Sequence, residues 1–413
     1  MTGGRHHDAD VVVTGMGALS AGGIGVAENW ANVLAGRSTA AIDPAMSDLP
    51  SSITYRIPDR LDIAAAIGVQ ELRRTDRTTQ LALIAAREAL ADAGLDPTTW
   101  DGARVGVVLG TSSGAATSYE KEYMTYAKEG PEWISPLFGI TAPMSLMAAY
   151  LAIALQAHGP GMVITTACAA GPSAIGTARQ LLRSGMCDVV LAGGSEAPLT
   201  RISLSSLYQM GALSDRMDQP AAASRPFDAD RDGMVLAEGA GVLVLERAED
   251  AKARSARSRA VVAGYGASTD GYHLSAPHPE GTGVELAVRM ALADAGLSTG
   301  DIAHVNAHGS STPLNDVTEG RLIARVYDHG PAVTANKGAV GHSLGAAGAL
   351  EAIFTVLSLE EGVVPPIANL EQLDKELDID VVSGTARQLP ADAAITHSFG
   401  FGGQNAVLAF TRS

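Results

Sequence analysis

A thiol, two imidazoles and a lysine lie where strands are predicted to end and helices to begin, and a carboxylate lies inside one of those helices. Cys168 lies in TTACAAGPSAIGTARQLL, where small residues surround it and a glycine-punctuated helix follows at once. A helix that begins just after a cysteine places its positive end beside the sulfur and favours the nucleophilic thiolate. A lone cysteine is more often a small buried apolar residue, and Cys187, which leads into a strand, keeps that interpretation. We therefore predict that Cys168 is a nucleophile and that its thiol pKa lies below the ~8.5 of a free cysteine.

The other polar groups lie later in the chain. His308 ends a predicted strand in VNAHGSSTPLND, in a turn rich in glycine and hydroxyl residues, where an imidazole is available for function. The segment ANKGAVGHSLGAAGALE adds Lys337, His342 and Glu351. Taken singly, such a histidine is more often a capping or surface residue, and such a lysine a solvated charge. Together with Cys168 they form a constellation of a nucleophile, two imidazoles and a cation.

A glycine-rich loop near the C-terminus, in ITHSFGFGGQNAVLAF, carries Phe399 and Phe401, two of only six phenylalanines in the chain. Gly400 and Gly402 allow the backbone to turn tightly and approach a ligand, so that N–H groups of this loop could face an oxyanion. The alternative is an ordinary hairpin with an apolar tip.

The elements that must position these residues occur twice. ALADAGL is repeated word for word at 89–95 and 291–297, each time closing an alanine-rich helical pattern with a glycine near its end. Three further pairs of matching segments occur in the same order, namely 11–20 with 261–269, 103–114 with 302–312, and 165–182 with 335–353. Strands alternating with helices then predict two related α/β halves, 1–255 and 256–413, packed as one body.

The first half carries the nucleophile and is expected to hold extra segments within 20–75 and 115–160. The second half carries the His/Lys/His set and the glycine-rich loop. Related halves bring their strand-to-helix loops to a shared centre, and the reactive residues of both halves are expected to meet there.

The set TACAAG, NAHGSSTPLND, NKGAVGHSLGAAGALE and SFGFGGQN, in that order, resembles the β-ketoacyl-acyl-carrier-protein synthases of the thiolase superfamily, specifically the elongating Cys-His-His type. The resemblance runs from VVVTGMGALS to the last strand. It implies a thiolase-like α/β fold with two related halves in an α-β-α-β-α body. It also implies decarboxylative Claisen condensation with malonyl-acyl-carrier protein, which lengthens a fatty acyl or polyketide chain by two carbons. No cofactor or metal is expected, because the substrates are carried on the phosphopantetheine of the acyl carrier protein.

The resemblance also implies residue roles. Cys168 would accept the acyl chain as a thioester. His308 and His342 would bind the malonyl thioester carbonyl and promote loss of CO₂. Lys337 would hold the second imidazole in its working state, and Glu351 would support it.

Further roles follow from the same resemblance. The backbone N–H groups of Cys168 and Phe401 would form the oxyanion hole, and Phe401 would gate the acyl pocket within the loop that holds Phe399, Gly400 and Gly402. Ser310 and Thr312 would meet the pantetheine arm. The chain departs from the family pattern at three positions, namely Ser310, Gln404 and Asn336. Ser310 keeps the hydroxyl, so little changes there, whereas Gln404 and Asn336 bear on chain-length preference and pathway.

Other functions fit less well. VVVTGMGALS lacks the third glycine of a dinucleotide fingerprint, and a ribose-binding acid about twenty residues on is missing. A degradative thiolase would need a second cysteine late in the chain. A non-catalytic chain-length partner would lack the nucleophile. A homodimer in fatty-acid synthesis and the catalytic half of a polyketide heterodimer both stay open.

The formal net charge of −16 argues against nucleic acid and anionic membranes as partners. An acidic carrier protein would need a local basic patch, and the predicted patch is Arg73, Arg74 and Arg77 in ELRRTDRTTQ. A competing run at the junction of the halves consists of Lys252, Arg254, Arg257 and Arg259.

Two cysteines nineteen positions apart argue against a disulfide framework and a zinc site. The N-terminal residues show no apolar signal core, and the most apolar stretch, 144–157, is shorter than the ~20 residues of a membrane span. The protein is expected in the cytoplasm.

Overall fold

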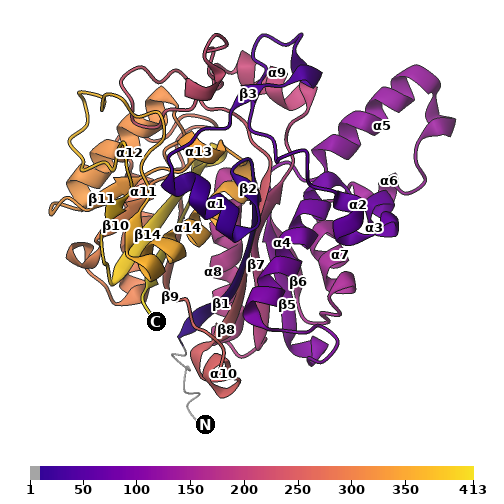
Figure 1. Ribbon diagram of the computed structural model, residues 1–413, viewed down its shortest axis with the longest axis horizontal. Coiled ribbons are helices and arrows are strands. Elements are labelled where there is room, and N and C mark those ends of the chain that lie inside the picture. Colours follow the sequence, from indigo (N-terminus) through magenta and orange to yellow (C-terminus); the bar gives the residue numbers. More distant parts are fainter. Residues whose placement is uncertain (1–9) are drawn as a thin grey trace.

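The computed structural model describes residues 10–413, and its main sheet joins two five-stranded parts of matching order (Figure 1). The first part runs β1 (Val11–Ser20), β8 (Gly239–Arg247), β7 (Val189–Glu196), β5 (Val105–Gly110) and β6 (Gly161–Ile164). The second part runs β9 (Ala260–Thr269), β15 (Gln404–Thr411), β14 (Ala393–Gly400), β10 (His304–Asn306) and β11 (Ala332–Thr334). β1 and β9 pair side by side, so the sheet is continuous across the junction of the halves.

Helices cover the outer faces of both parts and fill the space between them. In the first half α4 (Arg77–Ala93) and α7 (Leu146–Ala154) pack outside, and in the second half α11 (Thr282–Ala295) and α12 (Pro313–Val326) do so. The central layer consists of α8 (Ala170–Arg183) and α14 (Ala347–Glu361), which contact strands of both parts. The predicted α-β-α-β-α arrangement of two related halves is thereby confirmed.

The repeated ALADAGL segments end α4 and α11, and each helix packs against the strand of its own half that lies at the junction, β1 or β9. A Cβ atom placed on Gly17 of β1 would lie 1.9 Å from the Ala85 carbonyl oxygen, and one on Gly266 of β9 would lie 2.0 Å from that of Ala287. Only glycine allows this approach, so the paired Gly-x-Gly strands and alanine-rich helices of the sequence reflect one contact made twice.

The first half is larger because it holds extra elements in the two stretches expected from the sequence. Between β2 (Gly23–Ile24) and α4 lie α1 (Val26–Leu34), β3 (Ala41–Ile42), β4 (Ile53–Thr54), α2 (Ile63–Ile67) and α3 (Val69–Arg74). Between β5 and β6 lie α5 (Ala116–Glu129), α6 (Phe138–Thr141) and α7, and α5 projects from the body at the upper right of Figure 1.

The remaining elements join these layers. They are α9 (Arg201–Gln209), α10 (Ala248–Ala253), α13 (Lys337–Val340), β12 (Val363–Val364) and β13 (Arg387–Gln388). The predicted boundary after residue 255 falls in the connection between α10 and β9. None of the helices formed by residues 10–413 combines the length and the hydropathy that crossing a membrane requires.

Candidate active site

Cys168 lies in a tight turn between β6 and α8. The turn is a short 3₁₀ segment, Ala167–Ala169, and Ala167 adopts a φ of 50°, which is uncommon for a residue other than glycine. α8 begins at Ala170, as predicted. The same turn precedes α14, where Leu344 has a φ of 43° and Gly345 occupies the place of the cysteine. The fold therefore builds this turn twice and places the thiol on one copy.

Burial governs the state of the Cys168 thiol. Its side chain is 6% exposed, and removal from water raises the thiol pKa to about 12, while the charge of Lys337 and the backbone amide of Phe401 act in the opposite direction. The predicted pKa below that of a free cysteine is therefore wrong, because the cost of burying a thiolate outweighs the favourable end of the helix. Burial therefore favours the protonated form of the Cys168 thiol at neutral pH.

We expect iodoacetamide to modify Cys168 in preference to Cys187, because Cys168 lines the main cavity and Cys187 is fully buried in the core that both halves share. The raised pKa gives the sign of the pH dependence: the rate should keep rising from pH 7 to pH 10 without a plateau. Peptide mapping after partial alkylation at several pH values measures both effects. An adduct on Cys187, or a plateau below pH 9, would contradict them.

Two imidazoles from the second half meet near the thiol. His308 follows β10 and His342 follows α13, and their ring centroids are 5.3 Å apart with planes at 79°. Nδ1 of His308 lies 3.3 Å from the Lys337 ammonium, and Nδ1 of His342 accepts the backbone N–H of Leu344 at 3.2 Å. Because each Nδ1 faces a donor, the proton of each neutral ring is on Nε2.

Both imidazoles are neutral. Burial, followed by the charge of Lys337, holds the pKa of His308 and of His342 well below the usual range. A neutral ring with its proton on Nε2 is a hydrogen-bond donor of fixed direction, so the pair can stabilise a developing negative charge without giving up a proton.

Lys337 is fully committed within the site. Its ammonium lies 2.5 Å from the His308 carbonyl oxygen and 2.5 Å from Oε1 of Glu351, in addition to its contact with Nδ1 of His308. Lys337 contacts His308 directly and acts on His342, the imidazole named in the prediction, through its charge, which lowers the His342 pKa. Burial raises the pKa of Glu351 to about 7, and the charge of Lys337 opposes this rise.

The glycine-rich loop closes the site on the side of the thiol. A Cβ atom on Gly400 would lie 2.9 Å from the Cys168 backbone nitrogen, so a side chain there would displace the turn that carries Cys168. The Phe401 amide is directed at the Cys168 sulfur, and Gly402 donates its N–H to the Leu274 carbonyl at 2.7 Å. The Phe399 ring lies 5.6 Å from that of His308.

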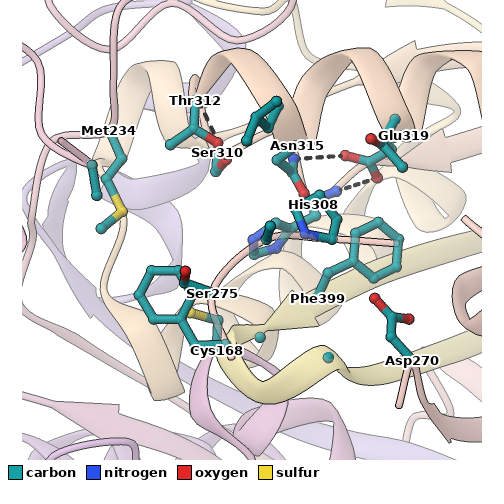
Figure 2. A pocket seen from close by; sticks show the side chains of 18 of the residues that line it. Cys168, Met234, Asp270, Ser275, His308, Ser310, Thr312, Asn315, Glu319 and Phe399 are labelled. Carbon is teal, nitrogen blue, oxygen red and sulfur yellow. Dashed lines mark hydrogen bonds between the residues drawn. The ribbon is translucent and has the colours of Figure 1, made fainter. Parts of the chain in front are cut away.

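A cavity of about 320 Å³ is lined by Cys168, His308, His342, Phe399 and Phe401. Figure 2 shows His308 between Cys168 and the pair Ser310 and Thr312, whose hydroxyls are 2.8 Å apart. The cavity thus has the thiol and the two imidazoles at one end and a pair of hydroxyls further along its wall.

Sequence reasoning missed Glu319, which lines the same cavity from α12. Its carboxylate accepts the backbone N–H groups of His308 and Gly309, both at 2.8 Å. An acid eleven residues after His308, on the first turns of a helix behind the histidine loop, was the available signal. Asp270, Met210 and Met234 also line the cavity, and no motif indicated them.

The predicted docking arginines are not equivalent. Arg73 and Arg74 are exposed at the end of α3. Arg77 instead forms a two-pronged pair with the buried carboxylate of Glu238, at 2.6 and 2.8 Å, and so is tied to the protein rather than presented to a partner.

The competing basic run is largely neutralised by acids of the chain itself. Arg254 pairs with Glu246, and Arg257 and Arg259 both pair with Glu360. The positive charge that this run presents at the surface is therefore reduced by Glu246 and Glu360.

Fold and site together place the chain in the thiolase-like α/β class, with one thiol and two imidazoles in one cavity. Models of the beta-ketoacyl synthase N-terminal and C-terminal domains match residues 8–251 and 259–371. The chain therefore belongs to the beta-ketoacyl synthase family.

Individual relatives cover almost the whole chain. A 3-oxoacyl-[acyl-carrier-protein] synthase 2 from Synechocystis sp. is 40% identical over 97% of this chain and 98% of its own length. The structure titled the ishigamide ketosynthase/chain length factor has a TM-score of 0.92 at 34% identity, covering 98% of this chain and 99% of that one. The structure of a type II polyketide acyl-carrier protein in complex with its ketosynthase, bound to the hexaketide, has a TM-score of 0.91 at 32% identity. The match covers 98% of this chain and 99% of that one.

Proposed function

We propose that this chain condenses an acyl group held on Cys168 with malonyl-acyl-carrier protein, releasing CO₂ and a β-ketoacyl-carrier two carbons longer. The observation that carries the proposal is the pair of Nε2–H donors, His308 and His342, which face one cavity beside the thiol. Such donors stabilise an enolate, the intermediate that any decarboxylative condensation must form.

In the first half-reaction the Cys168 sulfur attacks the acyl thioester of the carrier. The C–S bond to pantetheine breaks, and the proton of the protonated Cys168 thiol leaves with the pantetheine thiol. The amide of Phe401, directed at this sulfur, and the amide of Cys168 itself are the proposed donors to the thioester oxygen in the tetrahedral intermediate.

In the second half-reaction the malonyl thioester oxygen accepts hydrogen bonds from His308 and His342. The bond to the carboxylate breaks and CO₂ departs, leaving an enolate whose charge these donors stabilise. The enolate carbon attacks the acyl group on Cys168, and the sulfur leaves and takes up a proton. Ser310 and Thr312 are the proposed contacts for the pantetheine arm, and the reaction needs no cofactor held by the protein.

The proposed partner surface has two parts. One is a projecting arm formed by α5 and the short segment Pro131–Trp133 that follows it, and the other is the open edge of the sheet. β6 ends the strand order, and the arm and α7 expose large apolar side chains, among them Tyr123 (65%), Trp133 (64%) and Ile153 (75%). Apolar patches of this kind mark protein interfaces. A second copy of the chain and a chain-length partner both fit this surface. Both cysteines are free thiols, as the cytoplasm would keep them.

Reconstitution tests the proposal. The purified chain is incubated with acyl-carrier and malonyl-carrier, alone and with candidate chain-length subunits, and the products are identified by mass. A product two carbons longer from the chain alone would place it in fatty-acid elongation as a homodimer. Product only with a partner subunit would make it the catalytic half of a polyketide heterodimer. No product in either case, with Cys168 never acylated, would refute condensation.

The proposed docking patch for the acidic carrier is Arg73 with Arg74. The net charge of −16 repels an acidic partner at long range, so a local patch must focus the encounter. We expect Arg73→Glu with Arg74→Glu to raise the KM for acyl-carrier about 3- to 10-fold and to weaken its salt dependence. Turnover of a small acyl thioester without the carrier should not change.

The matched control is Lys252→Glu with Arg257→Glu, which reverses two exposed charges of the competing run and alters the net charge equally. If this control raises the carrier KM and the first variant does not, the carrier docks at the junction of the halves.

A further inference from the structure

A buried histidine that has no role in the proposed reaction steps lies behind the loop that carries His308. His397 is on β14, two residues before Phe399, and is 0% exposed. Its Nδ1 lies 3.2 Å from Oε1 of Glu319, and its Nε2 lies 3.2 Å from the hydroxyl of Tyr327. The His397 and Tyr327 rings are stacked at 24°, with centroids 6.1 Å apart.

The partners fix the protonation of this ring. Both carboxylate oxygens of Glu319 act as acceptors of backbone N–H groups, so we assign the ring N–H of His397 to Nδ1, which donates it to Glu319, while Nε2 accepts the Tyr327 hydroxyl proton. His304, on the neighbouring strand β10, shows the contrast: it is equally buried, and neither ring nitrogen bonds to any residue between 10 and 413. His304 fills space, whereas both polar atoms of His397 are engaged.

The Glu319 oxygen that His397 contacts also accepts the backbone N–H of His308, at 2.8 Å. The other oxygen holds the amide of Gly309. The Phe399 ring lies 5.6 Å from the rings of both His308 and His397, so β14 and the loop that carries His308 meet at Phe399. In Figure 2 Glu319, His308 and Phe399 lie together on one side of the cavity.

We infer that His397 is a positioning residue for decarboxylation, acting through Glu319 to fix the backbone that carries His308. The inference rests on the proposed function. Of the two half-reactions, only the one that uses the imidazoles depends on this chain of contacts. Cys168 is carried by the turn before α8, and neither Glu319 nor His397 bonds to that turn among the described residues.

The test separates CO₂ release from acyl loading. His397→Phe keeps a stacked ring and removes both hydrogen bonds. We expect it to slow CO₂ release from malonyl-carrier by about 10²-fold, the cost of a misplaced catalytic group. Acylation of Cys168, followed by intact mass, should stay within about 2-fold of the parent rate, because the nucleophile is held elsewhere. His397→Leu replaces this variant if the larger ring prevents folding.

Two further variants distinguish positioning from packing. His397→Asn keeps an N–H donor for Glu319 and should restore most of the CO₂ release. Tyr327→Phe removes a buried hydrogen bond and should lower the melting temperature to a similar degree as His397→Asn, yet it should leave CO₂ release within about 2-fold, because the bond to Glu319 stays.

The inference is overturned if His397→Phe releases CO₂ at the parent rate, if loading and release fall together, or if His397→Asn is as slow as His397→Phe. Failure of the parent protein itself to release CO₂ would instead refute the proposed function. The two failures are therefore distinguishable.

Discussion

Cys168→Ala is expected to lose acyl loading and condensation entirely while it continues to release CO₂ from malonyl-carrier. The thiol is the only group in the described cavity that can form the acyl thioester, so no other residue replaces it. The two imidazoles keep their orienting partners, Lys337 and the Leu344 amide, in this variant. Intact mass after exposure to acyl-carrier and measurement of released CO₂ follow the two half-reactions separately.

His308→Ala is the matched opposite. It should acylate Cys168 at close to the parent rate and release CO₂ about 10²- to 10³-fold more slowly, which is the usual cost of one lost oxyanion donor. The division of labour would be wrong if both variants, while folded by thermal melting, lost both activities.

Lys337→Met is expected to be the most damaging change outside the reacting groups. Lys337 and Glu351 are 1% and 2% exposed, and breaking a buried pair costs about 3–5 kcal/mol in the free energy of unfolding, since one charge is left uncompensated. Loss of the donor to Nδ1 also frees the His308 ring to take the other tautomer, so CO₂ release should fall about 10²-fold.

The sign of the pH dependence follows from Glu351. Its pKa in the folded protein is about 7, above the ordinary value of 4.5 for a glutamate, so its protonation favours the folded state and stability falls as pH rises from 4.5 through 7. Without Lys337 this loss should deepen, and the variant should be closest to the parent in stability below pH 5. Chemical denaturation of parent and variant from pH 4 to pH 8 measures this difference.

A control for this variant is available in the first half. Arg254→Met breaks a pair with the buried carboxylate of Glu246, outside the cavity. It should lower stability and leave CO₂ release unchanged. Equal loss of CO₂ release in both variants would show that Lys337 acts only through stability.

Much of the architecture could be predicted because both halves contain the sequence pattern for the same contact, an alanine-rich helix packed on a glycine-containing strand. Gly17 and Gly266 have no side chain where α4 and α11 touch their strands, and the matching helix endings at Gly94 and Gly296 are both left-handed. These constraints are local, so the residues show them directly. The meeting of Cys168 with His308 and His342 followed from the symmetry of the halves.

What the sequence could not supply depends on distances between segments far apart in the chain. The sequence places Lys337 five residues before His342, yet the ammonium bonds to His308, twenty-nine residues earlier, because β10 and β11 are neighbours in the sheet. Burial of the Cys168 thiol and the partner of Arg77 are likewise set by tertiary contacts. No local pattern encodes how much water is removed from a group, and that loss decides its pKa.

The continuity of the sheet across β1 and β9 determines which motions the enzyme can use. The two halves share a hydrogen-bonded strand pair and the helices α8 and α14, and residues 347–359 of α14 are all buried. A hinge between the halves would have to break these contacts together, so the active-site cleft does not open by rotation of one half on the other. We expect a substrate to be admitted by movement of surface segments, above all the loop that begins at Gly400. Movement confined to this loop would leave the turn that carries Cys168 and the segments that carry His308 and His342 in place, but it would withdraw the Phe401 amide from the sulfur, so the loop must close again before the thiol can react.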